Sequence, residues 1–165
     1  MAINFNGRVA IVTGAGGGLG RQHALALAAR GAKVLVNDLG SGVHGEGGSV
    51  SPAQAVVDEI RAAGGEALAN GASVTDFAAV EAMVQQAIDA WGRVDILVNN
   101  AGILRDKSFA KMSMDDFNLV VQVHLMGAAH CCKAAWPHMV AQDYGRIVMT
   151  TSSTGPHGTF GQANS

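Results

Sequence analysis

Apolar residues along this chain follow two alternating patterns. In the first, short apolar runs rich in Val, Ile or Ala predict strands: 8–14, 32–38, 66–74, 94–102 and 145–153. In the second, apolar residues recur at helical spacing and predict helices: 19–31, 51–65, 76–92 and 114–141. Strands that alternate with helices favour βαβ units around a parallel sheet, so the chain is expected to have an α/β fold.

Residues with strong terminal preferences support these helix boundaries. Gly31 is expected to stop the first helix, and Ser51, followed by Pro52, to cap the second. Asp76 is expected to cap the third helix. Pro137 is expected to kink the long helix or to start it afresh, because proline has no N–H to donate within a helix.

Length, charge and cysteine content narrow the class of protein. The 165 residues, 48% of them hydrophobic, suffice for a single domain over 1–165. With a formal charge of −2 and no run of Lys or Arg, the sequence offers no basic surface that would bind nucleic acid or an acidic membrane. No signal peptide and no apolar stretch of about 18 residues is evident, so a cytoplasmic protein is expected. The adjacent Cys131 and Cys132 are interpreted as reduced packing residues.

The segment TGAGGGLG (13–20) joins the first predicted strand to the first predicted helix. Its glycines allow positive φ angles and bring backbone N–H groups close to a ligand, and the helix that starts near Leu19 points its positive end at the same place. This geometry favours a pyrophosphate; the alternative is a tight turn that binds nothing. A literal G-x-G-x-x-G also occurs at Gly40, Gly42 and Gly45, but no helix follows it directly, so no phosphate is expected there.

Asp38 closes the second predicted strand, 24 positions after Gly14. An acidic residue about 20 positions beyond such a loop reaches the adenosine ribose of a dinucleotide. Its carboxylate would accept a hydrogen bond from the 2′-hydroxyl and repel a 2′-phosphate. Because no Lys or Arg lies between Asp38 and Arg61, NAD is favoured over NADP. The alternative is a solvated turn residue.

Four motifs, TGAGGGLG, NDLG, NNAG and GRIVMTTSS, occur in an order and at intervals that resemble the short-chain dehydrogenase/reductase family. The family's T-G-x-x-x-G-x-G loop matches Thr13, Gly14, Gly18 and Gly20. The stretches NNAGILRDKSFAKMSMDDFN and VHLMGAA look closer still to one branch, the (3R)-hydroxyacyl-CoA and 17-beta-hydroxysteroid dehydrogenase domains of peroxisomal multifunctional enzymes type two and their bacterial relatives.

This resemblance implies a Rossmann-like, doubly wound parallel sheet in three α/β/α layers that binds NAD. It also implies interconversion of a secondary alcohol and a ketone, with an acyl-CoA or a steroid as the small-molecule substrate, and a homodimer or homotetramer. It places further cofactor contacts at two strand ends: Ser73 and Val74, and the turn Asn99, Asn100, Ala101 and Gly102. Many members of the family have Asp where this chain has Ser73.

Two side chains coincide with family positions that serve catalysis. Ser152 matches the catalytic serine, whose hydroxyl holds the substrate oxygen; without the resemblance it is an ordinary strand-end serine. His124 stands where many members have an Asn in a proton relay; without the resemblance it is a core or helix-surface histidine. A metal site at His124, His130 and Cys131 is a third alternative, although the spacing matches no closed ligand set.

The family's catalytic tyrosine would stand thirteen residues after Ser152, where this chain has Ser165 as its last residue. A serine hydroxyl is a far weaker acid than a tyrosine, and Tyr144 is not expected to reach the site. The C-terminal part of the fold is expected to be missing, which leaves the fifth strand as an open edge. We therefore expect a catalytically incomplete portion of an NAD-dependent dehydrogenase. The alternative is an NAD-binding module that catalyses nothing or that a partner chain completes.

Overall fold

The computed structural model describes residues 3–40 and 51–164, and its centre is one parallel sheet. The strands lie in the order β3-β2-β1-β4-β5, with these bounds: β1 Val9–Val12, β2 Lys33–Asn37, β3 Ala67–Asn70, β4 Ile96–Asn99 and β5 Arg146–Met149. Val12 pairs with Val36 on one side and with Val98 on the other, so the carboxyl ends of the central strands lie at one edge. Each strand is shorter than its predicted run.

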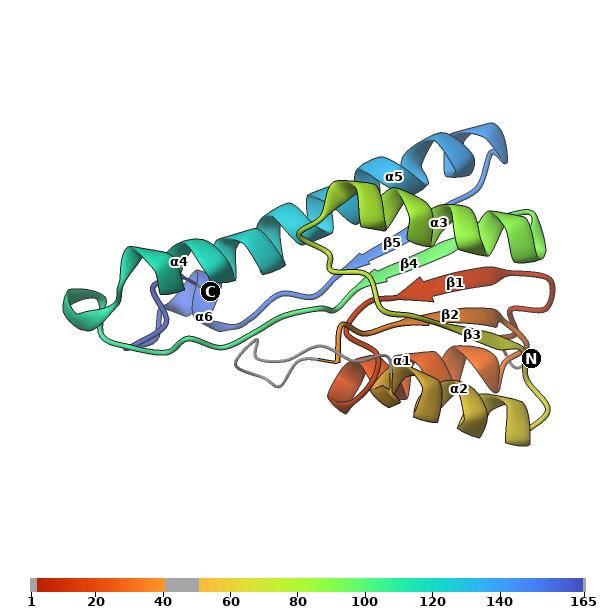
Figure 1. Ribbon diagram of the computed structural model, residues 1–165, viewed down its shortest axis with the longest axis horizontal. Helices are drawn as coiled ribbons and strands as arrows, with labels where there is room; N and C mark the ends of the chain where they lie inside the picture. Colours follow the sequence, from red (N-terminus) through yellow and green to blue (C-terminus); the bar gives the residue numbers. More distant parts are fainter. Residues whose placement is uncertain (1–2, 41–50, 165) are drawn as a thin grey trace.

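Helices cover both faces of this sheet, as Figure 1 shows. On one face lie α1 (Gly18–Ala28) and α2 (Ser51–Ala62), and on the other lie α3 (Phe77–Trp91) and α5 (Gly127–Ala141). A helical arm precedes α5 and extends beyond the sheet: η1 (Phe109–Lys111), α4 (Met114–Val121) and the π-helical turn η2 (Gln122–Met126). The short α6 (Thr154–His157) follows β5, and the segment after it meets the segment before η1 in a bridge between Lys107 and Gln162. The predicted α/β fold with a doubly wound sheet is confirmed.

Alternating side chains of the strands supply two apolar cores. Val12, Val34 and Val36 lie on the face covered by α1 and α2, where they share one core with Val56 and Ile60 of α2. The neighbouring strand positions face α3 and α5, where the core residues include Ile11, Leu35, Met83, Leu97 and Ala135. Every residue of β1 and β4 is buried, so the two strands that bear the loop 13–20 and the turn after β4 lie on a rigid centre.

The predicted cap of α3 is correct, but of the two alternatives at Pro137 the fresh start of a helix is wrong. The Asp76 carboxylate accepts a hydrogen bond from the N–H of Ala79 at 3.1 Å. Pro137 lies inside α5, which continues through it. Its neighbours Ala135 and Met139 are buried against the sheet while Pro137 is exposed, so packing on one face holds the helix despite the missing N–H. The change in helical geometry lies earlier, at η2.

The amino ends of the strands are joined by a buried carboxylate. Asp95 has no exposed side-chain surface and accepts hydrogen bonds from Arg8, from Arg93 and from the N–H of Val9 at 2.6–2.9 Å. Burial raises the pKa of Asp95, but these hydrogen bonds outweigh it and hold the pKa below its usual range. The Arg8 guanidinium lies over the Tyr144 ring, with its Cζ 3.6 Å from the ring centroid. Tyr144 is therefore at the end of the sheet away from the loop 13–20.

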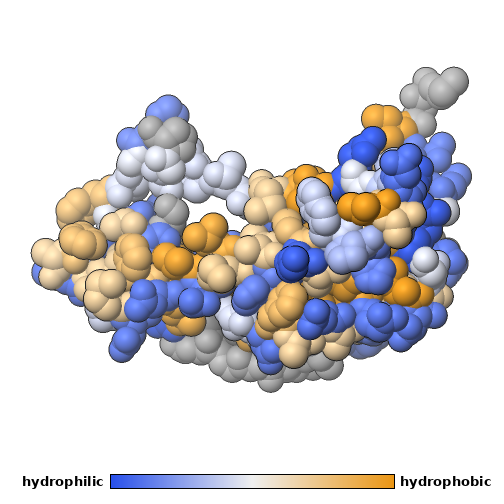
Figure 2. All heavy atoms as spheres, turned by 90° about the horizontal axis from the view of Figure 1, so that it is seen from above, coloured by the Kyte–Doolittle hydropathy of each residue, from blue (hydrophilic) through white to orange (hydrophobic). Residues whose placement is uncertain are grey.

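The edge strand β5 has much of its side-chain surface exposed. Val148 is 47% and Met149 53% exposed, and Trp136 of the adjacent α5 is 58% exposed. The view from above in Figure 2 shows apolar side chains among polar ones on that face of the molecule. None of the helices in the described segments is both long and apolar enough to span a membrane.

Candidate functional site

The loop 13–20 follows β1 and packs against the turn after β4, backbone to backbone. Gly14 has a φ of +61°, and a Cβ there would lie 2.8 Å from the Ala101 Cα. A Cβ on Gly20 would overlap the carbonyl oxygen of Gly14 and the Asn100 side chain. Both positions therefore require glycine. Gly14 needs it for the positive φ and the close neighbour, and Gly20 needs it for space alone.

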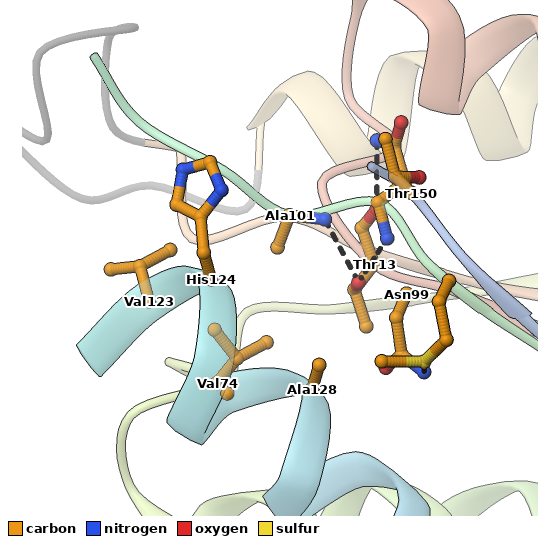
Figure 3. A pocket seen from close by; sticks show the side chains of 11 residues that line it. Thr13, Val74, Asn99, Ala101, Val123, His124, Ala128 and Thr150 are labelled. Atoms are coloured by element: carbon orange, nitrogen blue, oxygen red, sulfur yellow. Dashed lines mark hydrogen bonds between the residues drawn. The ribbon is translucent and has the colours of Figure 1, made fainter. Parts of the chain in front are cut away.

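Hydrogen bonds fasten the same two segments together. The Thr13 hydroxyl accepts from the N–H groups of Asn100 and Ala101, each at 3.0 Å (Figure 3). The Asn100 side-chain amide donates to the carbonyl oxygens of Thr13 and Gly14, also at 3.0 Å. Thr13 is only 1% exposed. The predicted cofactor residues Thr13 and Asn100 thus shape the loop from beneath, and their polar groups bond to the protein.

In the part of the chain that the structure describes, the start of α1 is open to a ligand. A Cβ on Gly17 or Gly18 would meet no other atom within 4 Å, and Gly18 has a φ of +50°. Among residues 3–40 and 51–164 no side chain caps this helix, and its first turn holds no acidic residue. Leu19, at the same end, is 70% exposed. Free N–H groups at the positive end of a helix bind anions, so this end of α1 fits a phosphate group.

Asp38 follows β2 and lies directly beside this loop. One carboxylate oxygen accepts from the N–H of Gly16 at 2.8 Å, and the other accepts from the N–H of Gly40 at 2.7 Å. The carboxylate is thus fixed in orientation and keeps lone pairs for a further donor. Gly40 of the literal G-x-G-x-x-G is a partner of Asp38 here, while Gly42 and Gly45 lie outside the described residues.

Ser73 and Val74 lie beyond the end of β3. The Ser73 hydroxyl is 2.8 Å from the hydroxyl of Thr75. Val74 is 7% exposed, and its carbonyl oxygen is 2.9 Å from Nδ1 of His130. The predicted strand 66–74 ends at Asn70, so both residues belong to a loop whose backbone α5 supports.

His124 lies in the π-helical turn η2 and contacts the segment after the turn 99–102. Its Nε2 is 3.0 Å from both the nitrogen and the carbonyl oxygen of Ile103, so its tautomer decides which bond forms. A Cβ on Gly102 would lie 2.9 Å from the His124 ring, so this glycine admits the imidazole. The predicted catalytic histidine therefore binds the backbone that continues from the cofactor turn.

A small cavity of about 60 Å³ opens between this turn, His124 and the end of β5 (Figure 3). Thr13, Val74, Asn99 and Thr150 are among the residues that line it. The buried Oδ1 of Asn99 has no hydrogen-bond partner within the described residues. The resemblance implies a cofactor contact at the turn that includes Asn99, but the sequence gives no sign that this amide oxygen is buried and unpaired beside the cavity.

Ser152 lies three residues beyond β5 and is exposed. Its Oγ accepts hydrogen bonds from the backbone N–H and the hydroxyl of Thr154 at 3.2 and 2.9 Å. The residues that β5 and its extension place at the cavity are Met149 and Thr150. The described structure thus does not bring Ser152 and His124 together at that cavity, and Ser165 lies outside the described residues. The catalytic role of Ser152 stays a prediction.

The alternative metal site finds no support in residues 3–40 and 51–164, where no group of three His, Cys, Asp or Glu side chains could hold an ion. The His130 ring instead packs against Phe77 in a tilted arrangement, with ring centroids 5.4 Å apart. Cys131 is buried, and this burial together with the charge of Cys132 raises its pKa to about 12. Both cysteines are free thiols, as expected.

A parallel sheet with a glycine-rich turn after β1 and an acidic residue after β2 defines a dinucleotide-binding fold. The chain belongs to the short chain dehydrogenase family, which matches it over residues 8–164. This confirms the predicted resemblance.

Individual relatives agree with this assignment. The chain is 59% identical to "Peroxisomal multifunctional enzyme type 2" of Drosophila melanogaster, over 98% of this chain and 27% of that protein. A short chain dehydrogenase from Mycobacterium avium matches with a TM-score of 0.87 and 47% identity, over 98% of this chain and 58% of that one. A 7α-hydroxysteroid dehydrogenase in complex with NADH and 7-oxoglycochenodeoxycholic acid matches with a TM-score of 0.88 and 33% identity, over 98% and 59%. The chain thus spans less than two thirds of these relatives.

Proposed function

We propose that the chain is the NAD-binding part of an oxidoreductase that interconverts a secondary alcohol and a ketone. The observation that carries the proposal is the fixed Asp38 carboxylate beside the open start of α1. Together they offer an acceptor for a ribose hydroxyl and N–H donors for a pyrophosphate at the same end of the sheet. A family member of the same fold is described in complex with NADH. When bound, NAD would supply the hydride acceptor of the reaction.

The charges near the loop favour NAD over NADP. Asp38 would repel a 2′-phosphate, and a cation would be needed to reverse this preference. The first cation after the loop, Arg21, forms an ion pair with Glu59 at 2.6 Å. Its guanidinium is therefore already neutralised by a carboxylate.

The substrate class follows from the relatives. One is named a multifunctional enzyme of peroxisomes, and another is described with a 7-oxo bile acid. We infer a 3-hydroxyacyl-CoA or a hydroxysteroid as substrate, with the Ser152 hydroxyl on the reacting oxygen and His124 as a second polar group. The cytoplasmic location and the homodimer or homotetramer stay predictions, and the peroxisomal names of relatives make the compartment a point to test.

A non-catalytic NAD-binding module is the second candidate function. It is favoured by the exposed Ser152, bonded to Thr154, and by Ser165 at the position of the family's tyrosine. Mixing the chain with NAD and a (3R)-hydroxyacyl-CoA and following NADH absorbance separates the two candidates. Sustained formation of NADH supports the dehydrogenase, and saturable NADH binding without turnover supports the module.

Replacing Asp38 with alanine is expected to weaken NADH binding by about tenfold, the cost of one charged hydrogen bond. Fluorescence titration with NADH and with NADPH measures the effect, and the wild-type preference for NADH should largely disappear. Asp58→Ala is the matched control, because Asp58 is exposed on α2 and accepts only from Gln54 among the contacts described. Tighter binding of NADPH than of NADH by the wild type would contradict the role of Asp38.

Replacing Ser152 with alanine is expected to leave NADH affinity unchanged and to weaken binding of a 3-oxoacyl-CoA to the NADH complex by about fivefold, the value of one neutral hydrogen bond. Titration of the ketone into the preformed complex measures this. Thr154→Ala is the control, because it removes the hydroxyl that donates to Ser152 and keeps the serine. Equal ketone affinity in wild type and Ser152→Ala would refute the assigned role.

A further inference from the structure

Gly16 occupies a narrow space between three neighbours. A Cβ at this position would lie 2.6 Å from the Cβ of Pro52 and 2.8 Å from both Cγ and Oδ2 of Asp38. All three distances are shorter than real Cβ contacts. At the next residue, Gly17, a Cβ would meet nothing within 4 Å. The restriction is therefore specific to one position of the loop.

The need for glycine at position 16 does not come from the backbone conformation. Gly16 is not among the glycines with a positive φ, so other residues could adopt its main-chain angles. What excludes a side chain is the Asp38 carboxylate on one side and the Pro52 ring on the other. Pro52 lies at the start of α2, where ring and helix restrict its movement. The Asp38 side chain is the partner that can rotate away.

The position of this carboxylate depends on the same residue. The N–H of Gly16 holds Oδ2 at 2.8 Å and the N–H of Gly40 holds Oδ1 at 2.7 Å, so each carboxylate oxygen has a donor that limits its rotation. A side chain on residue 16 would push against Oδ2 and break this arrangement. The carboxylate would then turn from the loop, where a ribose would bind.

We propose that Gly16 is a positioning residue for cofactor selectivity: the absence of its side chain keeps Asp38 where it accepts the ribose 2′-hydroxyl and repels a 2′-phosphate. This inference rests on the proposed function and deepens it. Gly16 influences cofactor selectivity only through the position of Asp38. Binding of the phosphates is assigned instead to the open positions Gly17 and Gly18.

The test is the ratio of the NADPH to the NADH dissociation constant, measured by fluorescence titration. Gly16→Ala is expected to weaken NADH binding more than NADPH binding and to lower this ratio by about tenfold. Gly17→Ala is the matched control: its backbone is extended, with φ −162°, and any effect on the phosphates is common to both cofactors, so the ratio stays at the wild-type value. An unchanged ratio in Gly16→Ala overturns the proposal.

A double-mutant cycle separates positioning from a general deformation of the loop. In an Asp38→Ala background, adding Gly16→Ala should change the ratio no further, because the carboxylate it displaces is gone. A further fall in the ratio would show that residue 16 acts by another route and would overturn the proposal. If the wild type binds neither cofactor, the proposed function fails. If it binds NADH and the Gly16→Ala ratio is normal, only the present inference fails.

Discussion

Alanine at position 20 is expected to weaken NADH binding by at least about 100-fold and to lower the free energy of unfolding by about 2 kcal/mol. The added methyl group would overlap the carbonyl oxygen of Gly14 and the Asn100 amide. Because both are part of the hydrogen bonds that join the loop 13–20 to the turn after β4, the loop must move as a unit. The N–H groups at the start of α1 would move with it.

The sign of the stability change makes this test sharp. Gly20 lies inside α1, where helix propensity alone predicts that alanine stabilises by about 1 kcal/mol. Steric overlap predicts the reverse. Denaturant unfolding and NADH titration measure the two effects. Gly17→Ala is the control for the unfolding measurement, because its Cβ meets no neighbour. A stabilised Gly20→Ala with normal NADH affinity would show that the loop does not need this close contact.

Replacing Asp95 with asparagine is expected to lower the free energy of unfolding by about 3 kcal/mol, at the lower end for removing one partner of a buried ion pair. The lower end applies because Arg8 and Arg93 are each about one third exposed, at 33% and 37%. An asparagine NH₂ group cannot accept from the N–H of Val9 or from a guanidinium, so at least one buried donor loses its acceptor. The amino ends of β1 and β4 would lose their common tie.

The pH dependence of stability tests the same carboxylate. The folded-state pKa of Asp95 lies below its unfolded value of about 3.9, so the unfolded state binds more protons in the interval between them. The stabilisation is complete above about pH 4 and is lost as the pH falls through the folded pKa. Asp95→Asn should lack this dependence. Asp89→Asn is the control, since Asp89 is exposed on α3 and should change stability by less than about 0.5 kcal/mol. A small loss of stability in Asp95→Asn would show that the cost of burying the carboxylate cancels its attraction to Arg8 and Arg93.

The sequence predicts the order and type of the main elements because both depend on local signals. Alternation of apolar runs with helical spacing identifies the five strands, and a carboxylate at Asp76 predicts the start of α3. The ends of the strands are harder to predict. The predicted run 66–74 stops at Asn70, where pairing with Asn37 ends, and only the neighbouring strand determines that limit.

The helix prediction for 114–141 is right in extent and wrong in detail. A local rule predicts a kink or a new helix at Pro137, yet α5 runs through this residue, and burial of its neighbours Ala135 and Met139 holds the helix on the sheet. The π-helical turn at 122–126 has no sequence signal in the spacing of apolar residues. It coincides with the bond between His124 and Ile103, a contact between distant segments that a local pattern cannot contain.

The sequence predicts which residue types make up the candidate site, but it does not predict the contacts that hold them in place. The loop 13–20 and Asp38 are recognisable because glycines and a carboxylate stand at fixed intervals after two strands. The sequence does not show that Thr13 turns inward to hold the β4 turn, or that the N–H of Gly16 holds Asp38. These contacts arise where strands far apart in the chain end side by side.

The buried Cys131 gives the molecule an internal reporter of its own opening. A thiol reacts as the thiolate, and a pKa of about 12 leaves almost none of it at neutral pH while α5 is in place. Alkylation at this position therefore requires the helix to separate from the sheet and expose the sulfur to solvent. The half-buried Cys132 lies on the same helix and serves as the reference thiol. The alkylation rate of Cys131 relative to that of Cys132 therefore measures how often α5 separates from the strands in the native state.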